Sequence, residues 1–282
     1  MPVNYKIQGY NTGSSHLPKG GFRISPSGVE KFFSDKRTWY GENLLGEAKR
    51  FTGSTSTELG TIVHHVAEVV ANCKITGEQY NSELLHQEVE NYIAGLDPEE
   101  FDTSVINDLW RNMAEPLVKE YVLQTNTLIT EPFVFHELLP GVFPSGSIDA
   151  ITSTSPTDTW EMVLAGKHSG SLTVRDFKTA GKLPTSFSYA YKLQAMCYCY
   201  ILYKQYGIKV DNMELCFAVR PTKTLPVRTK QFTLPFDDTA FSMIEGILKL
   251  IAESVQCFKD WPDLQFMLAS DYRLKKNEIP RS

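Results

Sequence analysis

The stretch LTVRDFKTAGK, residues 172–182, ends an apolar, β-branched run with a carboxylate and an ammonium group. Asp176 and Lys178 are two residues apart, and side chains with that spacing on a β-strand point to the same face of the sheet. Such a pair is most often an ion pair at a solvated strand end. Its chemical meaning depends on which other side chains the fold brings to it.

The composition predicts a globular chain with a substantial core. The 282 residues are 42% hydrophobic and 12% aromatic, which suits one large domain or two small ones. No apolar run reaches the ~18 residues of a membrane-spanning helix, and the N-terminus lacks the apolar segment of a signal peptide. We expect residues 1–22 to form a loose arm, residues 23–282 to form a single domain, and no membrane partner.

The cysteine pattern indicates reduced thiols rather than a metal site. The number is odd, no C-x-x-C occurs, and several of these residues lie in apolar segments, so we expect core thiols of a cytoplasmic protein and no zinc or iron–sulfur site. The five cysteines are Cys73, Cys197, Cys199, Cys216 and Cys257.

Charge is unevenly distributed along the chain. The net charge is −5, but residues 163–231 carry eleven basic and three acidic residues, whereas residues 58–162 carry three basic and eighteen acidic. Local field steers a charged ligand more than total charge does. The basic segment contains the opening motif, which favours an anionic partner, although an uneven surface explains the pattern equally well.

Hydrophobic periodicity and turn residues predict a helical block followed by a mixed sheet. A Ser27–Glu30 capping box opens the first expected helix, and Asp97 with Pro98 opens the fourth. Gly207 is expected to end a long helix. The expected helices are 25–40, 57–73, 82–94, 97–124, 187–207 and 237–260, and the expected strands are 128–139, 146–152, 171–179, 212–221 and 227–236. This order predicts an α/β fold with a helical part over 23–125 and a sheet flanked by helices over 126–282.

A second carboxylate occurs in GSIDAI, residues 146–151, where Asp149 is surrounded by apolar residues. A strand ion pair would account for it, because a lone buried carboxylate is costly. If this strand neighbours the later one, Asp149 converges with Asp176 and Lys178. Two adjacent carboxylates repel each other, and a divalent cation with hard oxygen ligands, Mg²⁺ or Mn²⁺, removes that repulsion.

Two helices supply further candidates. His64 and Glu68 are four residues apart and share a helix face. Gly60 costs the same helix roughly 1 kcal/mol relative to alanine unless something approaches closely. Gln194 and Tyr198 share a face of the later helix, and together with Tyr191 and Lys192 they could stack and hydrogen-bond along a nucleic-acid strand. A lone helical histidine and a helical tyrosine are more often structural residues.

The order G-x-x-x-H, G-x-I-D, D-x-K-T, Q-x-x-x-Y resembles the RecB-type exonuclease branch of the PD-(D/E)xK nuclease superfamily. ISPSGVEKFFSDKRTWY, residues 24–40, also resembles the N-terminal helix motif of that branch. Together the motifs span about residues 24 to 200. The resemblance implies a restriction-endonuclease-like fold, in which a mixed central β-sheet is flanked by helices.

The resemblance also implies roles. Lys178 would orient or activate the attacking water, and Gln194 would position the scissile strand beside it. Glu131 matches a further acidic position of some members, and Glu68 is a candidate through its place beside His64. The implied ligands of one or two Mg²⁺ or Mn²⁺ ions are His64, Asp149, Asp176 and the Phe177 backbone carbonyl, and the expected DNA contacts are Tyr198, Lys182 and Lys192.

The chain departs from the iron–sulfur members of that branch. It has Asp35-Lys36 where they carry Cys-Pro, and no C-terminal cysteine triplet follows, so we expect no iron–sulfur cluster. No helicase domain accompanies the motifs, which makes the chain similar to the stand-alone nucleases of phages and prophages. The 27 residues from Asp149 to Asp176 are expected to form an elaborated hairpin.

We therefore predict an Mg²⁺- or Mn²⁺-dependent deoxyribonuclease, an exonuclease acting in recombination, repair or phage replication in the cytoplasm of a bacterial or phage-infected cell. The alternatives are a catalytically dead nucleic-acid-binding module, a restriction-type endonuclease and an acidic α/β scaffold. DNA is the expected partner. A single-strand annealing or binding protein is a further possible partner, and a homo-oligomeric state is also possible.

Overall fold

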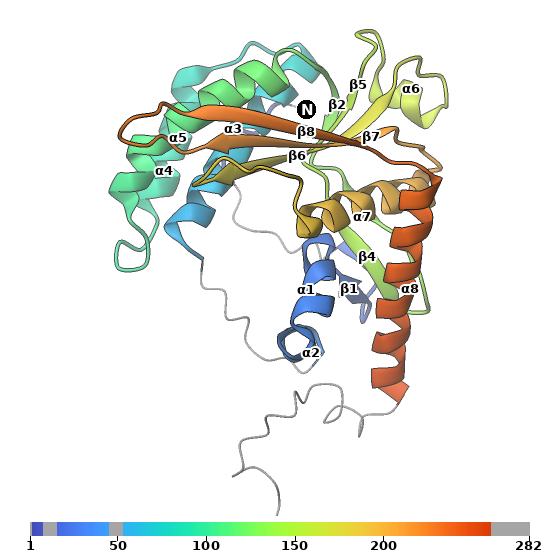
Figure 1. The fold of residues 1–282 in the computed structure, drawn as a ribbon. Helices are drawn as coiled ribbons and strands as arrows, with labels where there is room; N and C mark the ends of the chain where they lie inside the picture. The colour runs from blue at the N-terminus through green and yellow to red at the C-terminus, as the bar shows by residue number, and fades with distance from the viewer. Residues whose placement is uncertain (1, 8–15, 45–52, 261–282) are drawn as a thin grey trace, which may run out of the picture.

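The computed structural model describes residues 2–7, 16–44 and 53–260. The larger of its two sheets carries the opening motif on its central strand (Figure 1). Neighbouring strands run antiparallel except β6 and β7, which are parallel because α7 returns the chain between them. In spatial order the strands are β2 (Asn126–Thr130), β5 (Ala150–Ser153), β6 (Leu172–Ala180), β7 (Asn212–Val219) and β8 (Arg228–Pro235).

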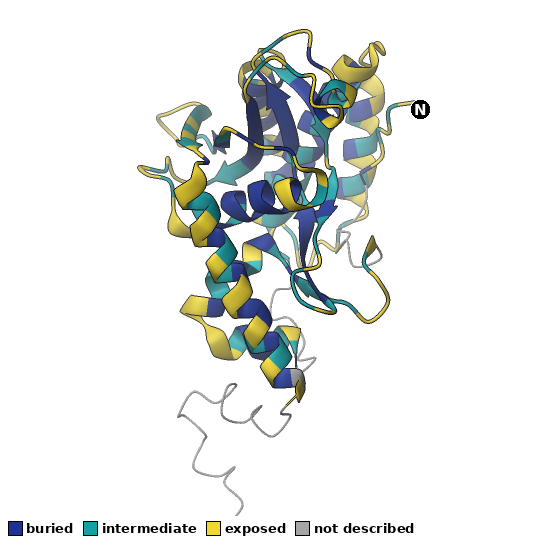
Figure 2. Ribbon diagram, turned by 90° about the vertical axis from the view of Figure 1, so that its right-hand side faces the viewer, coloured by how far each residue is buried: buried dark blue, intermediate teal, exposed yellow. Residues whose placement is uncertain are grey.

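Helices cover both faces of this sheet (Figure 1). Phe177 and Cys216 pack with α3, α4 and α5 on one face, whereas Val174 and Met213 pack with α7 and α8 on the other. Buried residues fill most of β5, β6 and β7 but none lies in the edge strand β8, and the outer helices alternate buried and exposed positions (Figure 2). The helices are α3 (Thr55–Thr76), α4 (Ser82–Ala94), α5 (Thr103–Leu117) with its π-helical extension η3 (Val118–Val122), α7 (Tyr189–Tyr206) and α8 (Asp238–Asp260).

A smaller three-stranded sheet adjoins the larger one. Its central strand β4 pairs in parallel with β1 and antiparallel with β3, and the chain passes from β4 to β5 through Ile148 and Asp149. Asp149 therefore lies where the chain crosses between the sheets. The remaining elements are β1 (Phe22–Ile24), η2 (Pro26–Gly28), α1 (Val29–Ser34), α2 (Lys36–Asn43), β3 (Phe133–Phe135), β4 (Val142–Ser147) and α6 (Trp160–Leu164).

The architecture confirms the predicted restriction-endonuclease-like fold, in which mixed sheets are flanked by helices after an N-terminal helical block. Three details differ from the sequence expectations. The expected strand 128–139 is two strands in different sheets, the expected strand 146–152 is broken at Asp149, and α6 lies within the expected hairpin between β5 and β6. The first two differences arise from the second sheet, whose pairing joins distant segments and leaves no local signal, whereas α6 is inserted within the antiparallel β5–β6 pair of the larger sheet.

Helix starts follow capping side chains, and two expected starts were wrong. The Ser25 hydroxyl, not Ser27, accepts the hydrogen bond from the Gly28 amide, and Asp35 caps a separate helix, α2. In α5 the cap is Asp102, whose carboxylate accepts from the Val105 amide, so the cap lies five residues later than Asp97 and the helix starts at Thr103. A cap satisfies one of the amides that the first turn leaves unbonded, and it therefore fixes the start.

Residues 2–7, which belong to the expected arm, contact α3. Ile7 is buried with the α3–α5 residues, and the Tyr5 carbonyl lies 2.8 Å from His65 Nε2. Residues 8–15 lie outside the described ranges, and the single domain expected over residues 23–282 stays a prediction. None of the described helices is both long and apolar enough to span a membrane.

Four of the five cysteines are core thiols, as expected. Cys73, Cys197, Cys199 and Cys216 are buried and free, but Cys257 is exposed on α8. The expectation was wrong for Cys257 because helical periodicity does not by itself say which face of α8 is covered.

Candidate active site

The end of β6 brings the carboxylate and the ammonium of the opening motif into contact. Asp176 is 2% exposed, and Lys178 Nζ lies 2.6 Å from its Oδ2. The register of β6 with β7 aligns them with Leu215 and Phe217, so both side chains face α7. The pair is thus a buried contact rather than a solvated strand end.

Asp149 joins this pair at the point where β5 diverges from β6. The two strands pair as far as Ala150 with Arg175. The Phe177 amide further along β6 donates instead to Asp149 Oδ2, at 2.7 Å. The crossing between the sheets therefore fixes one carboxylate against the backbone between Asp176 and Lys178.

Helix α3 brings His64 to the same carboxylate. His64 Nδ1 lies 3.4 Å from Asp149 Oδ2. One turn earlier, a Cβ added to Gly60 would stand 3.2 Å from Thr179 Oγ1 at the end of β6. The glycine that weakens the helix thus permits the close approach of α3 to β6 that places His64 at the site.

The carboxylates of Glu131 and Glu68 influence the electrostatics of Asp149 and Asp176. Burial raises the pKa of Glu131 far above its ordinary value, and the charges of Asp149, Glu68 and Asp176 raise it further. Glu131 also has a left-handed backbone, with φ 48°, a conformation that costs a non-glycine residue free energy and is common at functional sites. We call Glu68, Glu131, Asp149 and Asp176 the carboxylate cluster.

The electrostatics of the cluster follow from burial of like charges. Burial raises the pKa of Asp176 to about 6 and also raises that of Asp149, although Lys178 opposes both shifts. Burial disfavours the charged form of Lys178, but the charges of Asp176 and Asp149 outweigh it and hold its pKa above the ordinary value. Burial lowers the pKa of His64 to about 4, so its imidazole is neutral at pH 7.

Helix α7 supplies the predicted amide and hydroxyl. Gln194 Nε2 donates to Asp176 Oδ1 at 3.5 Å and to Tyr198 Oη at 3.4 Å. Tyr198 is 8% exposed, and its ring packs where the absence of a side chain at Gly146 leaves room. The Gln194 amide therefore lies between Asp176 and the Tyr198 hydroxyl.

The two predicted DNA-binding lysines lie nearby but outside this contact network. Lys182 is exposed in the loop after β6, and Lys192 is half-buried on α7. Neither forms an ion pair with a carboxylate in the described ranges. Tyr191, three residues before Gln194 and expected with it along a nucleic-acid strand, has its ring 5.3 Å from Lys178 Nζ. The signal for it was its place on the Gln194–Tyr198 helix face.

The residues present fit a divalent metal ion by their chemistry. Asp149 and Asp176 are carboxylates held close together, the charges of Glu131 and Glu68 act on them from nearby, and a neutral imidazole adjoins Asp149. Asp176 Oδ2 is buried and accepts no hydrogen bond of good geometry. As the side chains stand, however, no three His, Cys, Asp or Glu residues of the described ranges form a ready-made ligand set. Lys178 instead contacts the carboxylate of Asp176, and His64 contacts that of Asp149.

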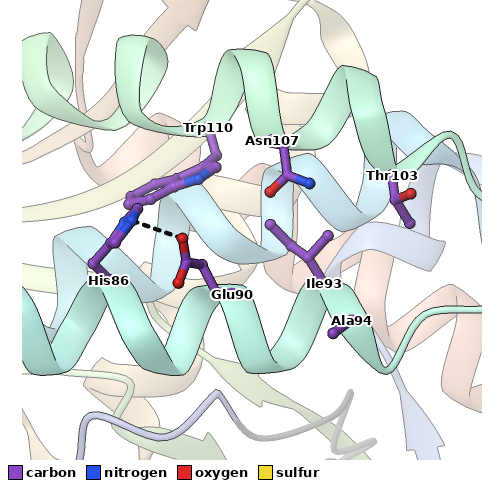
Figure 3. A pocket seen from close by; sticks show the side chains of 7 residues that line it. All are labelled: His86, Glu90, Ile93, Ala94, Thr103, Asn107 and Trp110. Carbon is purple, nitrogen blue, oxygen red and sulfur yellow. Dashed lines mark ion pairs between the residues drawn. The ribbon is translucent and has the colours of Figure 1, made fainter.

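A hollow elsewhere in the molecule contains none of the predicted residues (Figure 3). It lies between α4 and α5, where His86 stacks on Trp110 and its Nε2 lies 2.8 Å from Glu90 Oε1. Arg111 Nη2 lies 2.9 Å from the other ring nitrogen of His86. Both nitrogens of the histidine thus have partners, and the carboxylate cluster is the stronger candidate site.

Comparisons with known proteins agree with this geometry. A family model described as the PD-(D/E)XK nuclease superfamily matches residues 23–263. A solved structure from Eubacterium rectale, named "Putative exonuclease", is similar over 89% of this chain and 88% of its own, with 13% identity and a TM-score of 0.54. The alkaline exonuclease LHK-Exo of Laribacter hongkongensis aligns over 88% of this chain and 95% of its own, with 10% identity and a TM-score of 0.36. No curated protein sequence matches the chain.

Proposed function

Since the chain belongs to the PD-(D/E)XK nuclease superfamily, whose members use divalent metal ions such as Mg²⁺, we propose that it is a DNA exonuclease with its active site at the carboxylate cluster. The observation that carries the proposal is the convergence of Asp149, Asp176 and Lys178 at one end of β6. Three groups from two distant sequence motifs meet there within a few ångströms of one backbone amide.

Asp149, Asp176, His64 and the Phe177 carbonyl would hold one or two Mg²⁺ or Mn²⁺ ions. The negative charges of Asp149, Asp176 and Glu68 disfavour ionisation of Glu131, and a bound cation would relieve that repulsion. A bound divalent ion supplies Lewis-acid stabilisation of the phosphate oxygens and a water of lowered pKa.

Lys178 performs the second part of the chemistry. Its ammonium stays charged at neutral pH because two carboxylates hold its pKa high. It therefore places a positive charge beside the position where the attacked phosphate gains negative charge, which lowers the barrier selectively. It can also orient the attacking water through its remaining donors.

Gln194 positions the site from α7. Its side-chain amide donates to Asp176 and to the hydroxyl of Tyr198, so it ties the catalytic carboxylate to a buried helix. We assign to Tyr198 a supporting role for this amide, and to Lys182 and Lys192 contacts with DNA phosphates. Recombination, repair or phage replication remains the proposed setting.

An exonuclease requires a free DNA end, and this requirement separates the proposal from its alternatives. The Eubacterium rectale structure is itself named as an exonuclease, which supports the choice. The test is digestion of end-labelled linear, nicked and closed circular DNA with Mg²⁺ or Mn²⁺, with EDTA as the control. We expect the linear DNA to be degraded from its ends and the closed circle to stay intact.

Other outcomes of the same assay reject the proposal. Cutting of closed circles at defined positions would assign the site to a restriction-type endonuclease. Retention of DNA by the protein without cleavage in either metal would indicate a binding module. If the protein neither cleaved nor retained DNA, the result would indicate an α/β scaffold protein.

A further inference from the structure

A continuous line of side chains leads from Lys178 to the edge strand of the larger sheet. Tyr191, whose ring lies next to the Lys178 ammonium, packs on Phe217 at 6.0 Å between ring centroids, and Phe217 packs on Phe232, also at 6.0 Å. Lys230 Nζ lies 5.0 Å from the centroid of the Phe232 ring. We call these residues the aromatic path: Lys178, Tyr191, Phe217, Phe232 and Lys230.

Strand register explains why the path is continuous. Lys178 of β6 pairs with Phe217 of β7, and Phe217 pairs with Lys230 of β8, so the three side chains lie on one face. Two strand spacings separate the two lysines by about 10 Å. Alternation turns Thr229 and Gln231 to the opposite face, where the Thr229 hydroxyl donates to Glu120.

Apart from Asp176, which pairs with Lys178, the strands β6, β7 and β8 place no acidic side chain on the face that carries the path, and Lys230 and Arg228 make its β8 end positively charged. The sequence contains no Asp or Glu between residues 177 and 210 or between residues 215 and 236. Arg228 lies on the same face of β8 as Lys230, and its Nε is buried without a hydrogen-bond partner among the described residues. A ligand that brings an anionic acceptor would satisfy that donor.

The rings of the path are not fully covered by the protein. Tyr191 and Phe232 are partly buried, and they form a small apolar cluster of their own with Phe217. Aromatic faces alternating with cations are the chemistry by which proteins hold unpaired nucleic acid, because bases stack on rings and phosphates meet ammonium or guanidinium groups. A duplex hides its base faces and can use only the cations.

We infer that the aromatic path binds an unpaired DNA strand beside the scissile phosphate, with bases stacked on Phe232 and Tyr191 and phosphates held by Lys230 and Arg228. The inference rests on the proposed function, since the path ends at the active-site lysine. It adds the substrate class, which is a single-stranded DNA segment rather than an intact duplex. An exonuclease that frays a duplex end would feed the freed strand along this face.

The test measures binding in EDTA, where no cleavage occurs. The probe is fluorescein-labelled dT20, compared by anisotropy with an abasic chain of the same length. Phe232→Ala is expected to weaken dT20 binding roughly 5- to 100-fold, the effect of losing one base stack, and to leave binding of the abasic chain nearly unchanged. Lys230→Ala is expected to weaken both probes and to lower the salt slope of log Kd by about 0.7.

Gln231→Ala is the matched control, because it lies between these residues in sequence but on the other face of β8. It should bind both probes like the wild type. Phe232→Trp keeps a stacking ring and should retain dT20 affinity, so a loss in Phe232→Ala alone cannot come from a general defect of β8. If Phe232→Ala does not fold, the Lys230→Ala and Arg228→Gln salt slopes test the same path.

Three results would overturn the inference: equal dT20 affinity in Phe232→Ala and wild type, an equal loss for dT20 and the abasic chain, or tighter binding of U20 RNA than of dT20. The failure of the proposed function looks different. dT20 binding that depends on Phe232, without any metal-dependent digestion, would retain the aromatic path and reject the nuclease. Metal-dependent digestion, with dT20 binding that Phe232→Ala leaves unaltered, would retain the nuclease and reject the path.

Discussion

The Asp149 carboxylate accepts a hydrogen bond from the Phe177 backbone amide, with 2.7 Å between Oδ2 and N. The two residues are 28 positions apart, and this bond replaces the strand pairing that β5 gives up where it leaves β6. The same bond therefore ends a strand and sets the position of a catalytic candidate. Changes at Asp149 should affect local structure as well as chemistry, which makes Asp176 and Lys178 the cleaner positions for testing the mechanism.

Asp176→Asn and Lys178→Met should each lower the rate of DNA digestion by a factor of about 10³ or more. The first removes a metal-ligand candidate and the second removes the charge at the phosphate. The measurement is the initial rate of nucleotide release from end-labelled linear DNA. Asp108→Asn and Lys119→Met, on the exposed part of α5 and η3, are the matched controls and should digest DNA like the wild type. Digestion at the wild-type rate by either site variant would reject the assignment.

Glu131→Gln should raise the melting temperature in EDTA at neutral pH by no more than about 2 °C, because solvent screens the charge of this exposed residue. The reason for the direction is that burial and the neighbouring carboxylates disfavour the ionised form of Glu131, which an amide cannot adopt. The wild type should gain stability from millimolar MnCl₂ because the ion binds the folded state alone. Asp176→Asn should gain much less. A wild-type melting temperature insensitive to Mn²⁺ and Mg²⁺ would count against a metal site.

Gly60→Ala should stabilise the protein only when Thr179 gives way. Alanine favours the helix by about 1 kcal/mol, but its Cβ would stand 3.2 Å from Thr179 Oγ1. In a Thr179→Ala background we expect most of that gain, and in the wild-type background distinctly less. Urea denaturation of the four proteins gives the coupling free energy. Equal effects of Gly60→Ala in both backgrounds would show that the two residues do not meet.

Glu214→Gln should destabilise the fold by about 3–5 kcal/mol, because it leaves a buried guanidinium without its counter-charge. Arg175 is 4% exposed and its Nε donates to Glu214 Oε2 at 2.9 Å, on the face of the sheet opposite Asp176. The double variant Arg175→Met with Glu214→Leu should cost less than Glu214→Gln alone. Denaturant midpoints decide the order, and a larger cost in the double variant would contradict the argument.

Asp158 should contribute stability at neutral pH that is lost in acid. Donation from the Ser153 hydroxyl, together with the Ser169 and Gly170 amides, holds the pKa of Asp158 well below its ordinary value. The unfolded chain therefore takes up the proton first as pH falls. The difference in melting temperature between wild type and Asp158→Asn should be constant from pH 7 to about 4.5 and narrow below pH 4. A difference in melting temperature that widens in acid would show that folding raises the pKa of Asp158 instead of lowering it.

Helices were the part of the fold that the sequence predicted best. The expected span 82–94 coincides with α4, because its apolar spacing and its Asn81 cap are local features. The start of α5 was misplaced because Asp97 caps a turn instead, accepting from the Glu99 amide at 2.9 Å. Two acidic residues five positions apart compete for the same role, and only the path of the chain decides between them.

The order of the motifs supplied the candidate residues of the proposed site, whereas the contacts between them depend on the path of the chain. Asp176 and Lys178 share a strand face by period alone, and His64 follows Gly60 by one helical turn. The approach of Glu131 depends on the left-handed backbone between β2 and β3, which no spacing predicts. Of the aromatic path, the sequence pointed to Lys178 and Tyr191 but not to Phe217, Phe232 and Lys230, whose place depends on the pairing of β7 with β8.

The exposed thiol of Cys257 allows this protein to be labelled with a spectroscopic probe at one defined position. The other four thiols are enclosed, and burial raises the pKa of Cys197, Cys199 and Cys216 well above the range in which thiolates form. A maleimide dye should therefore attach at a single place near the end of α8, without engineered substitutions. Donor and acceptor dyes on the protein and on a DNA end would then follow the strand as it is consumed.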